Sequence, residues 1–496
     1  MISMIKNREA TLKFIIAAFA LLFLILMGYA FLNGSYHLAD EDEAIYYNGA
    51  RSFSETGSVR ATECNTENVS KIWQCNWYGP MYTMFYGSIA KIAGVHNYNF
   101  LIANILILAI IMVLIMRANF EHETKLLIVC SFLALYAFVG YAFTFYPETL
   151  ELLFAVILAL KLKVISAETK NNQKQTALYV LLVLFFALFR ISTIFWVFGL
   201  LAFSKSVKDF FIKLGIGIIC FLFVYIYIRY FNAPFYGSTM ALVMNDKLGL
   251  DTITLLLKKI VSNFYFFVTQ NPIYELLMLP VLAITAYSWF MSKNRLMLAA
   301  CIISLIYFVA LFTLYAPFSF FLNKQWACLY PLILIALYNT DKVNLKYIML
   351  LLLLVMSPIA YIKAAGLIRE RKRTAMESEK TQPMVSQFEQ IRNKVEGGKP
   401  ITILTLYREF DDKIPFPVFS SSLSVSTTDQ YPILYTYNFP ANRKHDSTFI
   451  NEKNFRLYHK IYVDYILSRY PLKIDSTSLT YSTDLFYLYK NNKKTK

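Results

Sequence analysis

Residues Phe14–Leu32 read FIIAAFALLFLILMGYAFL, an apolar run without a charged side chain. A helix needs about 20 apolar residues to cross the hydrocarbon core of a bilayer, so this run predicts a transmembrane helix. The run is longer than the apolar core of a secretory signal peptide, which usually has about 7–15 residues. We therefore expect a retained membrane anchor.

Further apolar runs follow the first one along the chain and decide the fold class. The eleven predicted spans lie near residues 14–32, 98–116, 126–145, 148–164, 177–189, 191–204, 210–231, 271–291, 296–315, 326–338 and 347–363. The sequence therefore predicts an α-helical polytopic membrane protein with about 11 transmembrane helices, a long first outer loop and a small C-terminal α/β outer domain.

Composition excludes a soluble enzyme. Of the 496 residues, 57% are hydrophobic and 16% are charged, whereas a soluble domain has about 25% charged residues. The formal net charge is +16, and a basic chain often binds nucleic acid. Here the basic residues gather between the apolar runs, at residues 6–13, 161–174, 205–213 and 293–295, as in cytoplasmic loops. We expect membrane lipids, and no nucleic acid, among the partners.

The basic residues before the first run predict the orientation of the chain. Lys6, Arg8 and Lys13 predict a cytoplasmic N-terminus, and an odd number of spans then sends the tail to the outer face. One cluster disagrees, because Arg369-Glu-Arg-Lys-Arg373 follows the last run and such a cluster favours the cytoplasm. Long domains cross largely regardless of charge, so we assign the tail to the outer face.

Two long polar segments remain on the outer side. The first is the loop at residues 33–97. The second is the tail, which we assign as an α/β domain at residues 364–496, separate from a transmembrane domain at residues 1–363. Within the tail, the patterns predict a strand at Ile401–Leu406, an amphipathic helix at Arg456–Arg469 and a closing strand pair at Leu479–Tyr489.

The six cysteines follow the same division. Cys64 and Cys75 lie in the outer loop, where an oxidising compartment permits a disulfide that closes a loop of about ten residues. Zinc is the weaker alternative, because two thiols without a nearby His or further Cys do not complete a tetrahedral site. The other four thiols lie within predicted spans, where a lone Cys usually packs as a small apolar side chain.

The outer loop begins with the acidic run Asp40-Glu-Asp-Glu43 in a chain that has few charges. If the following residues are helical, Tyr46 lies on the face of Asp42 and Tyr47 on the face of Glu43. A carboxylate and a phenol then share one surface. The simpler explanation is a solvated helix start, where acidic residues interact favourably with the helix dipole. Spacing alone favours this simpler explanation.

A second helix is predicted later in the loop. Asn76-Trp-Tyr-Gly-Pro80 precedes an aromatic-rich apolar segment that ends at Gly94 and is too short to cross a bilayer. Pro80 suits the first position of a helix, and Trp77 and Tyr78 suit the depth of the lipid headgroups. We expect a helix that lies in the membrane interface, and by composition simple anchoring explains its aromatic residues.

The order of these features resembles the C-type glycosyltransferases, especially the protein O-mannosyltransferase and aminoarabinose transferase branch. One span comes first, then an outer loop that opens with Asp42-Glu-Ala-x-Tyr46, then an aromatic-Gly-Pro helix. Three later segments also match, namely Phe145-Tyr-Pro-Glu-Thr-Leu150, Phe189-Arg-Ile-Ser-Thr193 and Lys324-Gln-Trp-Ala-Cys-Leu-Tyr-Pro331. The resemblance covers roughly residues 10–340. It implies single-displacement transfer of a sugar from a polyprenyl-phosphate donor to a hydroxyl acceptor, at the outer face of a bacterial inner membrane.

The resemblance also implies roles for individual residues. Asp42 matches the family's Asp-Glu pair and is expected to act as the catalytic base with Glu43 beside it, although Asp40-Glu41 offers a competing register. Arg190 and Lys324 match positions that neutralise the leaving phosphate, and lipid headgroup contact explains them equally well. We expect substrate contacts from Tyr46, Tyr47, Trp77, Tyr78, Glu148, Glu151, Arg190 and Lys324.

Glu148 and Glu151 stand one helical turn apart at the start of a predicted span. Stabilisation by the helix dipole is the simpler account, and contact with the substrate or with a divalent metal ion is the alternative. The spacing identifies no metal. The sequence departs from the family at Gly79, where many relatives carry a basic residue before the Pro, so one phosphate contact is missing or supplied elsewhere. Lys91 or Arg51 could substitute.

Two other classes of protein remain open. A transporter or flippase for a lipid-linked glycan predicts charges near the midpoints of spans, whereas Asp42, Glu148, Arg190 and Lys324 gather near one boundary. An O-antigen-type polymerase predicts basic residues in large late loops, and the loop near residues 232–251 contains a single Lys. Both classes agree less well with the sequence. The acceptor stays open among a lipid, a glycan and a protein.

Overall fold

The computed structural model describes residues 2–32, 41–59, 63–65, 79–167, 173–231, 250–270, 277–314, 326–340, 343–380, 402–407, 433–438, 465–468, 477–483 and 487–492. The chain divides into two compact units. The helical unit comprises Met1–Gly34, Leu101–Tyr227 and Gly237–Ile368, and the loop–tail unit comprises Ser35–Phe100, Ile228–Tyr236 and Arg369–Lys496. Segments that are far apart in sequence therefore fold together.

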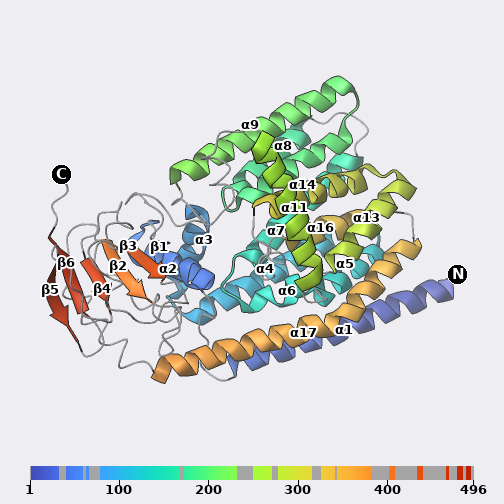
Figure 1. Ribbon diagram of the computed structural model, residues 1–496. Helices are drawn as coiled ribbons and strands as arrows, with labels where there is room; N and C mark the ends of the chain where they lie inside the picture. The colour runs from blue at the N-terminus through green and yellow to red at the C-terminus, as the bar shows by residue number, and fades with distance from the viewer. Residues whose placement is uncertain are drawn as a thin grey trace. The chain divides into compact units, whose positions relative to one another are not determined.

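Apolar helices make up the described part of the helical unit (Figure 1). Their bounds are α1 Ile2–Phe31, α4 Asn97–Arg117, α5 His122–Ala134, α6 Tyr136–Val139, η1 Tyr141–Phe143, α7 Glu148–Ala167, α8 Gln173–Ala187, η2 Ile191–Phe203, α9 Val207–Phe231, α11 Leu250–Gln270, α13 Met278–Ser292, α14 Arg295–Leu314, α16 Leu329–Tyr338 and α17 Val343–Lys380. Helices α4, α9 and α17 extend into the loop–tail unit. Among the described residues, five helices are long and apolar enough to cross a membrane, or six with a bent pair.

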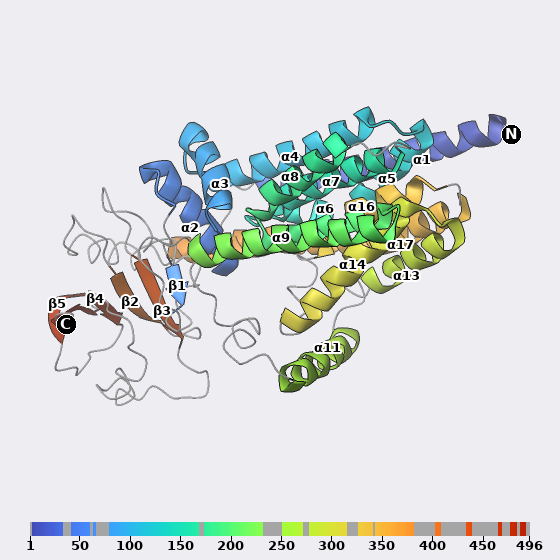
Figure 2. The same cartoon turned by 90° about the horizontal axis from the view of Figure 1, so that it is seen from above.

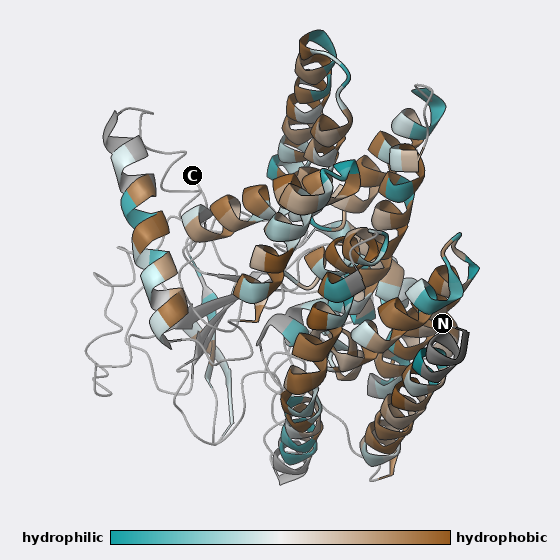
Figure 3. Ribbon diagram, turned by 90° about the vertical axis from the view of Figure 1, so that its right-hand side faces the viewer, coloured by the Kyte–Doolittle hydropathy of each residue, from teal (hydrophilic) through white to brown (hydrophobic). Residues whose placement is uncertain are grey.

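These helices leave long apolar faces uncovered by protein. On α1, Leu21, Leu24 and Ile25 are 57–60% exposed, and on α9 Ile219 and Ile226 are 65–68% exposed. Figure 3 shows apolar residues along the helices, with polar residues gathered towards several of their ends. Soluble proteins rarely expose apolar surfaces of this extent, because such surfaces are unfavourable in water. The exposed faces are therefore suited to contact with lipid.

Helices α1 and α17 lie side by side in the helical unit (Figure 1). The rings of Phe19 and Tyr361 stack with their centroids 5.6 Å apart. The Tyr361 hydroxyl also lies 3.2 Å from the carbonyl oxygen of Phe19 and 3.1 Å from that of Leu133 in α5. One phenol thus connects three helices, close to the point where α5 ends.

The span predicted at residues 126–145 is broken in the structure. Helix α5 and the following α6–η1 segment differ in direction by 72°. Leu135 has an extended backbone (φ −88°, ψ 132°), which interrupts the helical hydrogen bonds without a proline. A Cβ atom at Gly140 would collide with the Tyr136 ring, so glycine lets this ring pack against the backbone after the break. The span near residues 126–145 stays a prediction, and the sequence analysis did not predict this bend, because backbone conformation and not hydropathy sets it.

The last helix also differs from its prediction. Helix α17 does not end near residue 363 but continues to Lys380, so Arg369–Arg373 is helical. Hydropathy analysis does not detect this extension, because the charged side chains from Arg369 onward lower its hydropathy. Residues 191–204, predicted as a span, form the 3₁₀ helix η2, and four described apolar helices are shorter than 18 residues. The count of eleven spans stays a prediction.

Helix α11 was not predicted. It packs on α14 through Phe264 and Phe267, whose rings lie 6.1 and 5.7 Å from the ring of Phe312. The Asn263 side chain donates a 2.7 Å hydrogen bond to the carbonyl oxygen of Phe312. Figure 2 shows α11 beside the end of α14. Lys258 and neighbouring polar residues interrupt its apolar pattern, which made the segment hard to recognise as a helix from sequence.

The described strands of the loop–tail unit form one six-stranded mixed sheet. They are β1 Glu63–Asn65, β2 Thr402–Tyr407, β3 Ile433–Asn438, β4 Tyr465–Ser468, β5 Thr477–Ser482 and β6 Tyr487–Asn491, in the spatial order β1-β3-β2-β4-β6-β5. Strands β1, β3, β2 and β4 are parallel, whereas β6 runs antiparallel to β4 and β5 antiparallel to β6.

The tail confirms two predicted elements and corrects a third. Strand β2 confirms the strand predicted at Ile401–Leu406, and β5 with β6 confirms the pair at Leu479–Tyr489. The helix predicted at Arg456–Arg469 is wrong at Tyr465–Ser468, which forms β4 between β2 and β6. Pairing on both edges overrides the helical periodicity of this short segment. Residues 456–464 lie outside the described residues.

Strand β1 comes from the first outer loop and pairs with β3 of the tail, with Glu63 opposite Leu434 and Asn65 opposite Thr436. The structure therefore groups residues 35–100 with the tail, whereas the sequence analysis assigned the loop to the transmembrane domain at residues 1–363. A short strand carries too little periodicity to be predicted from sequence. The α/β class of the tail stays a prediction, because its expected helix falls largely outside the described residues.

Candidate active site

The acidic run opens helix α2, Glu41–Thr56, in the loop–tail unit. One face of this helix is buried at the spacing i, i+3, i+4 and i+7, and its members are between 0 and 8% exposed: Glu43, Tyr46, Tyr47 and Ala50. Asp42 lies in the first turn, beside this buried face. The side chain of Asp42 and the whole of Asp40 lie outside the described residues.

Helix α3, Pro80–Ala93, packs closely against α2, and we call the two the acidic helix pair. A Cβ atom at Gly87 would lie 2.7 Å from the Cβ of Phe53 and 2.8 Å from the carbonyl oxygen of Ala50, so glycine permits the close approach. The rings of Tyr46 and Tyr82 meet edge to face, with centroids 5.8 Å apart. The two motifs of the outer loop thus form one packed element.

The backbone at Gly79 explains where the sequence departs from the family. Gly79 precedes α3 with φ +82° and ψ 177°, a conformation that L side chains rarely adopt. Pro80 follows at the first helical position, and Gly94 ends the helix with φ +87°. The helix predicted after Pro80 is confirmed, and its position in the membrane interface stays a prediction. A basic side chain at residue 79 would strain this turn.

Glu43 forms a buried ion pair with Arg371 of α17, within the loop–tail unit. Nη1 and Nη2 of Arg371 donate to Oε2 and Oε1 of Glu43, and the two side chains are 1% and 0% exposed. Two parallel charge-assisted hydrogen bonds fix the direction of both groups. The catalytic role predicted for Glu43 stays a prediction, and the structure adds a partner that the sequence analysis did not assign.

The two tyrosines of α2 are packed against other aromatic rings. The Tyr47 ring lies 5.5 Å from that of Phe100, and Tyr46 contacts Tyr82 as described above. Burial raises the pKa of the Tyr47 phenol, which therefore stays protonated near neutral pH. Substrate contact by Tyr46 and Tyr47 stays a prediction, and their described surroundings are those of packing residues.

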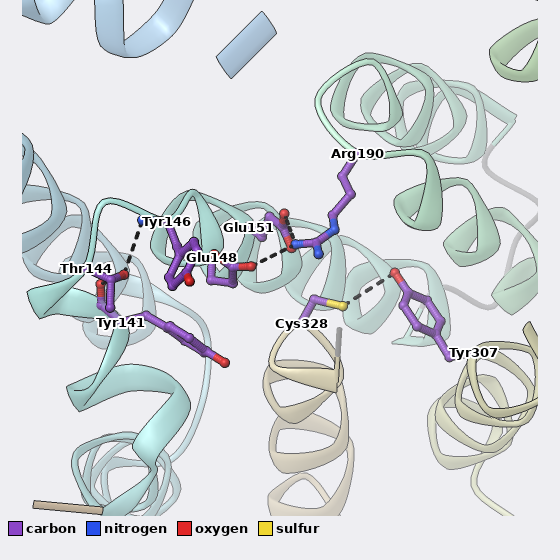
Figure 4. Close-up of polar contacts among 8 residues, drawn as sticks. All are labelled: Tyr141, Thr144, Tyr146, Glu148, Glu151, Arg190, Tyr307 and Cys328. Carbon is purple, nitrogen blue, oxygen red and sulfur yellow. Dashed lines mark hydrogen bonds and ion pairs between the residues drawn. The ribbon is translucent and has the colours of Figure 1, made fainter. Parts of the chain in front are cut away.

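A second cluster lies in the helical unit and consists of Glu148, Glu151 and Arg190 (Figure 4). We call it the carboxylate–arginine cluster. Glu148 and Glu151 lie one turn apart at the start of α7, and Arg190 has an extended backbone (φ −145°, ψ 122°) between α8 and η2. Arg190 Nη1 contacts Oε1 of Glu151 and lies 3.3 Å from Oε1 of Glu148. The structure thus brings three predicted site residues together.

The carboxylate–arginine cluster is largely, but not completely, shielded from solvent. The side chains of Glu148 and Glu151 are 2% and 4% exposed, and that of Arg190 is 14% exposed. Figure 4 shows the Cys328 thiol near the cluster, where it donates a 3.4 Å hydrogen bond to the Tyr307 hydroxyl. Charged groups buried among apolar helices are candidates for function by default, because their burial is costly.

The charge balance of the cluster bears on the role predicted for Arg190. Two carboxylates face one guanidinium among the described members, so an incoming phosphate meets negative charge beside the positive group. Both ion pairs use the same guanidinium atom, Nη1, so they do not by themselves exclude a phosphate at Arg190. Its predicted role stays a prediction, as does that of Lys324, which lies outside the described residues.

The same geometry tests the expectation of a metal ion. Glu148 and Glu151 already have a cation, the Arg190 guanidinium, as their partner. In the described part of the chain, no group of three or more His, Cys, Asp or Glu side chains gathers at one place. The described residues therefore do not fit a divalent metal site, and a metal requirement stays a prediction without structural support.

Comparisons with known proteins find structural similarity only. No protein-family model matches the chain, and no curated protein matches its sequence. The chain is similar to ArnT from Cupriavidus metallidurans in a crystal structure bound to undecaprenyl phosphate, with a TM-score of 0.49 and 10% identity over 97% of this chain and 98% of that one. The same protein in its apo state gives a TM-score of 0.48 and 10% identity over 95% and 98%.

Some of the predicted site residues cannot be placed. Trp77, Tyr78 and Cys75 lie outside the described residues, as does the side chain of Cys64, so the predicted disulfide is untested. Sequence reasoning missed Arg371, although the unexpected basic run after the last span was a signal for it. It also missed Asn104, a fully buried residue of α4 whose side chain donates a 2.8 Å hydrogen bond to the carbonyl oxygen of Thr144.

Proposed function

We propose that this chain is a membrane glycosyltransferase that moves a sugar from a polyprenyl-phosphate donor to a hydroxyl group of a lipid, glycan or protein acceptor. The reaction takes place at the outer face of a bacterial inner membrane. The observation that supports this most directly is the acidic helix pair. Asp42 and Glu43 open α2, and α2 packs on the Gly79–Pro80 helix, so the two loop motifs that resemble the family form one element.

The chemistry follows from the residue types. The acceptor oxygen attacks the anomeric carbon of the sugar while the bond from that carbon to the phosphate oxygen breaks. The Asp42 carboxylate takes the proton of the acceptor hydroxyl, and the polyprenyl phosphate leaves with the bonding electron pair. A single displacement of this kind inverts the configuration at the anomeric carbon. Lys324 supplies positive charge to the leaving phosphate.

The carboxylate–arginine cluster has a separate part in this proposal. Glu148 and Glu151 accept hydrogen bonds from sugar hydroxyl groups, and Arg190 holds both carboxylates in place. Their low exposure supports this assignment, because hydrogen bonds made in a shielded site discriminate strongly between ligands.

The experiment that tests the function compares lipid-linked sugars and surface glycans, by mass spectrometry, in a deletion strain and its complemented forms. We expect one polyprenyl-phosphate sugar to accumulate and one sugar to disappear from an envelope acceptor. Wild-type protein restores the acceptor, and Asp42→Asn does not. An unchanged set of acceptors would contradict the proposal. A donor retained on the cytoplasmic face would indicate a flippase, and shortened glycan chains would indicate a polymerase.

A further inference from the structure

The ion pair between Glu43 and Arg371 joins side chains that lie 328 residues apart in sequence. The two side chains are almost completely buried, and each guanidinium Nη atom faces a different carboxylate oxygen. Such a bidentate pair of hydrogen bonds, which we call the fork, fixes the direction of the carboxylate as well as its position. Arg371 of α17 thus holds the start of α2, although the two helices are far apart in sequence.

The fork acts on the part of α2 that most needs support. The first N–H groups of a helix have no partners within the helix, so a helix start frays unless other groups hold it. Glu43 is in the first turn and directly follows Asp42. Successive residues are about 100° apart around a helix axis. Fixing Glu43 therefore also fixes the direction in which the Asp42 side chain leaves the helix.

Burial indicates a geometric role for the pair. Removing two charges from water costs free energy, and apolar side chains of similar volume often stabilise a protein as well or better. Stability alone therefore gives no reason to keep a buried Arg and Glu at this place. A need to orient the carboxylate does give such a reason. The planar guanidinium forms two parallel hydrogen bonds with a carboxylate, and a lysine ammonium does not.

We propose that Arg371 is a positioning residue, which orients the first turn of α2, and with it Asp42, by holding Glu43. This inference rests on the proposed function of Asp42. Under it, Asp42 accepts the proton and Glu43 serves as the anchor of the helix. The same helix carries a comparison pair, Arg51 and Glu55, which is 3.0 Å apart and much more exposed, with side chains 25% and 32% accessible.

The first test measures how firmly the start of α2 is held, independently of sugar transfer. Hydrogen–deuterium exchange of the peptide at residues 41–56 is followed by mass spectrometry in the full-length protein, reconstituted in lipid nanodiscs. Arg371→Lys keeps the charge and loses the fork, so we expect its first-turn amides to exchange at least tenfold faster than in the wild type. Glu55→Gln breaks the exposed pair with Arg51 and should exchange at the wild-type rate. Equal exchange in Arg371→Lys and wild type would overturn the proposal.

The second test measures transfer with the lipid extract of the deletion strain as the donor. Rates are expressed per folded molecule, so that a loss of folded protein does not count as a loss of rate. We expect Arg371→Lys to lower kcat at least tenfold and to leave the half-saturating amount of extract within twofold. An unchanged kcat would overturn the proposal. Full transfer by Asp42→Asn would overturn the proposed role of Asp42 as the base instead, and the exchange rates separately decide whether Arg371 holds α2.

Discussion

The Nδ2 atom of Asn104 lies 2.8 Å from the carbonyl oxygen of Thr144, and this bond ties α4 to the turn that leads into Glu148. Asn104 is fully buried, and Thr144 is 2% exposed. The Thr144 hydroxyl in turn accepts a 3.3 Å hydrogen bond from the backbone N–H of Tyr146 (Figure 4). A buried amide thus supports the backbone that presents the carboxylate–arginine cluster.

We expect Asn104→Leu to reduce transfer by moving this turn. The change leaves the Thr144 carbonyl without its donor, and a buried group left in this way costs about 1–3 kcal/mol. The matched control is Asn263→Leu, which removes a similar buried bond to Phe312 far along the chain from the cluster. Both variants should melt at lower temperature, and only Asn104→Leu should lose transfer. Equal transfer losses would show that stability alone is responsible.

The catalytic base is tested by Asp42→Asn, which keeps the size of the side chain and removes the carboxylate. General-base catalysis is worth about 10²–10⁴-fold in rate, so transfer should fall by that range. Membranes with matched expression are assayed for sugar transfer. Asp40→Asn is the partner variant, because the competing register predicts the reverse result, with Asp40→Asn inactive and Asp42→Asn active.

Arg190→Ala should destabilise the protein as well as impair it. The change leaves two nearly buried carboxylates without their cation, and breaking a buried ion pair costs about 3–5 kcal/mol. Replacing Glu151 by Gln in the same chain removes one of these charges and should restore part of the lost stability. Thermal unfolding in detergent measures both effects. A melting temperature unchanged in Arg190→Ala would contradict the pairing seen here.

Lys324→Ala tests whether Lys324 contacts the leaving phosphate, independently of the carboxylate–arginine cluster. If Lys324 neutralises the leaving phosphate, its loss should lower the rate of transfer while the protein inserts and melts normally. The donor is titrated in membranes from the deletion strain, with Lys293→Ala, at the opposite predicted face, as the control. Wild-type kinetics in Lys324→Ala would assign this residue to lipid headgroups.

The orientation of the chain is tested with single cysteines and a membrane-impermeant thiol reagent. Ser482→Cys in β5 is exposed and should react in intact cells whose outer membrane has been opened. Lys174→Cys at the start of α8 lies in a predicted cytoplasmic loop and should react only after the inner membrane is opened. The opposite pattern would reverse the predicted sidedness.

Sequence patterns predicted well those features that local chemistry controls. The apolar run at Phe14–Leu32 lies in α1, the Pro80 helix starts and ends at the predicted residues, and the strand near Ile403 is present. Each depends on composition or on a residue with a special backbone. The patterns failed where tertiary contacts decide, as at β4, whose pairing partners come from other parts of the chain.

The candidate site residues could be predicted from the sequence, but their long-range partners could not. The acidic run and the two glutamates of α7 stand out in a chain with few charges, and the sequence singles them out for that reason. Their partners are less visible, because Arg190 pairs with Glu151 across 39 residues and Arg371 with Glu43 across 328. No local pattern links residues at such separations. The basic segment Arg369–Arg373 stood out in the sequence only because basic clusters beside a span favour the cytoplasm, whereas the tail was assigned to the outer face.

The pairing of β1 with β3 also constrains how often the chain crosses the membrane. Hydrogen-bonded strands of one open sheet do not straddle hydrocarbon, so both strands lie on one side, and Glu43 and Arg371 obey the same condition. The chain between residues 65 and 433 therefore makes an even number of crossings, whichever of the short helices span and whichever turn back. If α1 crosses once, the total is odd, and the N-terminal end of α1 faces the compartment opposite the tail. This parity holds without any hydropathy threshold.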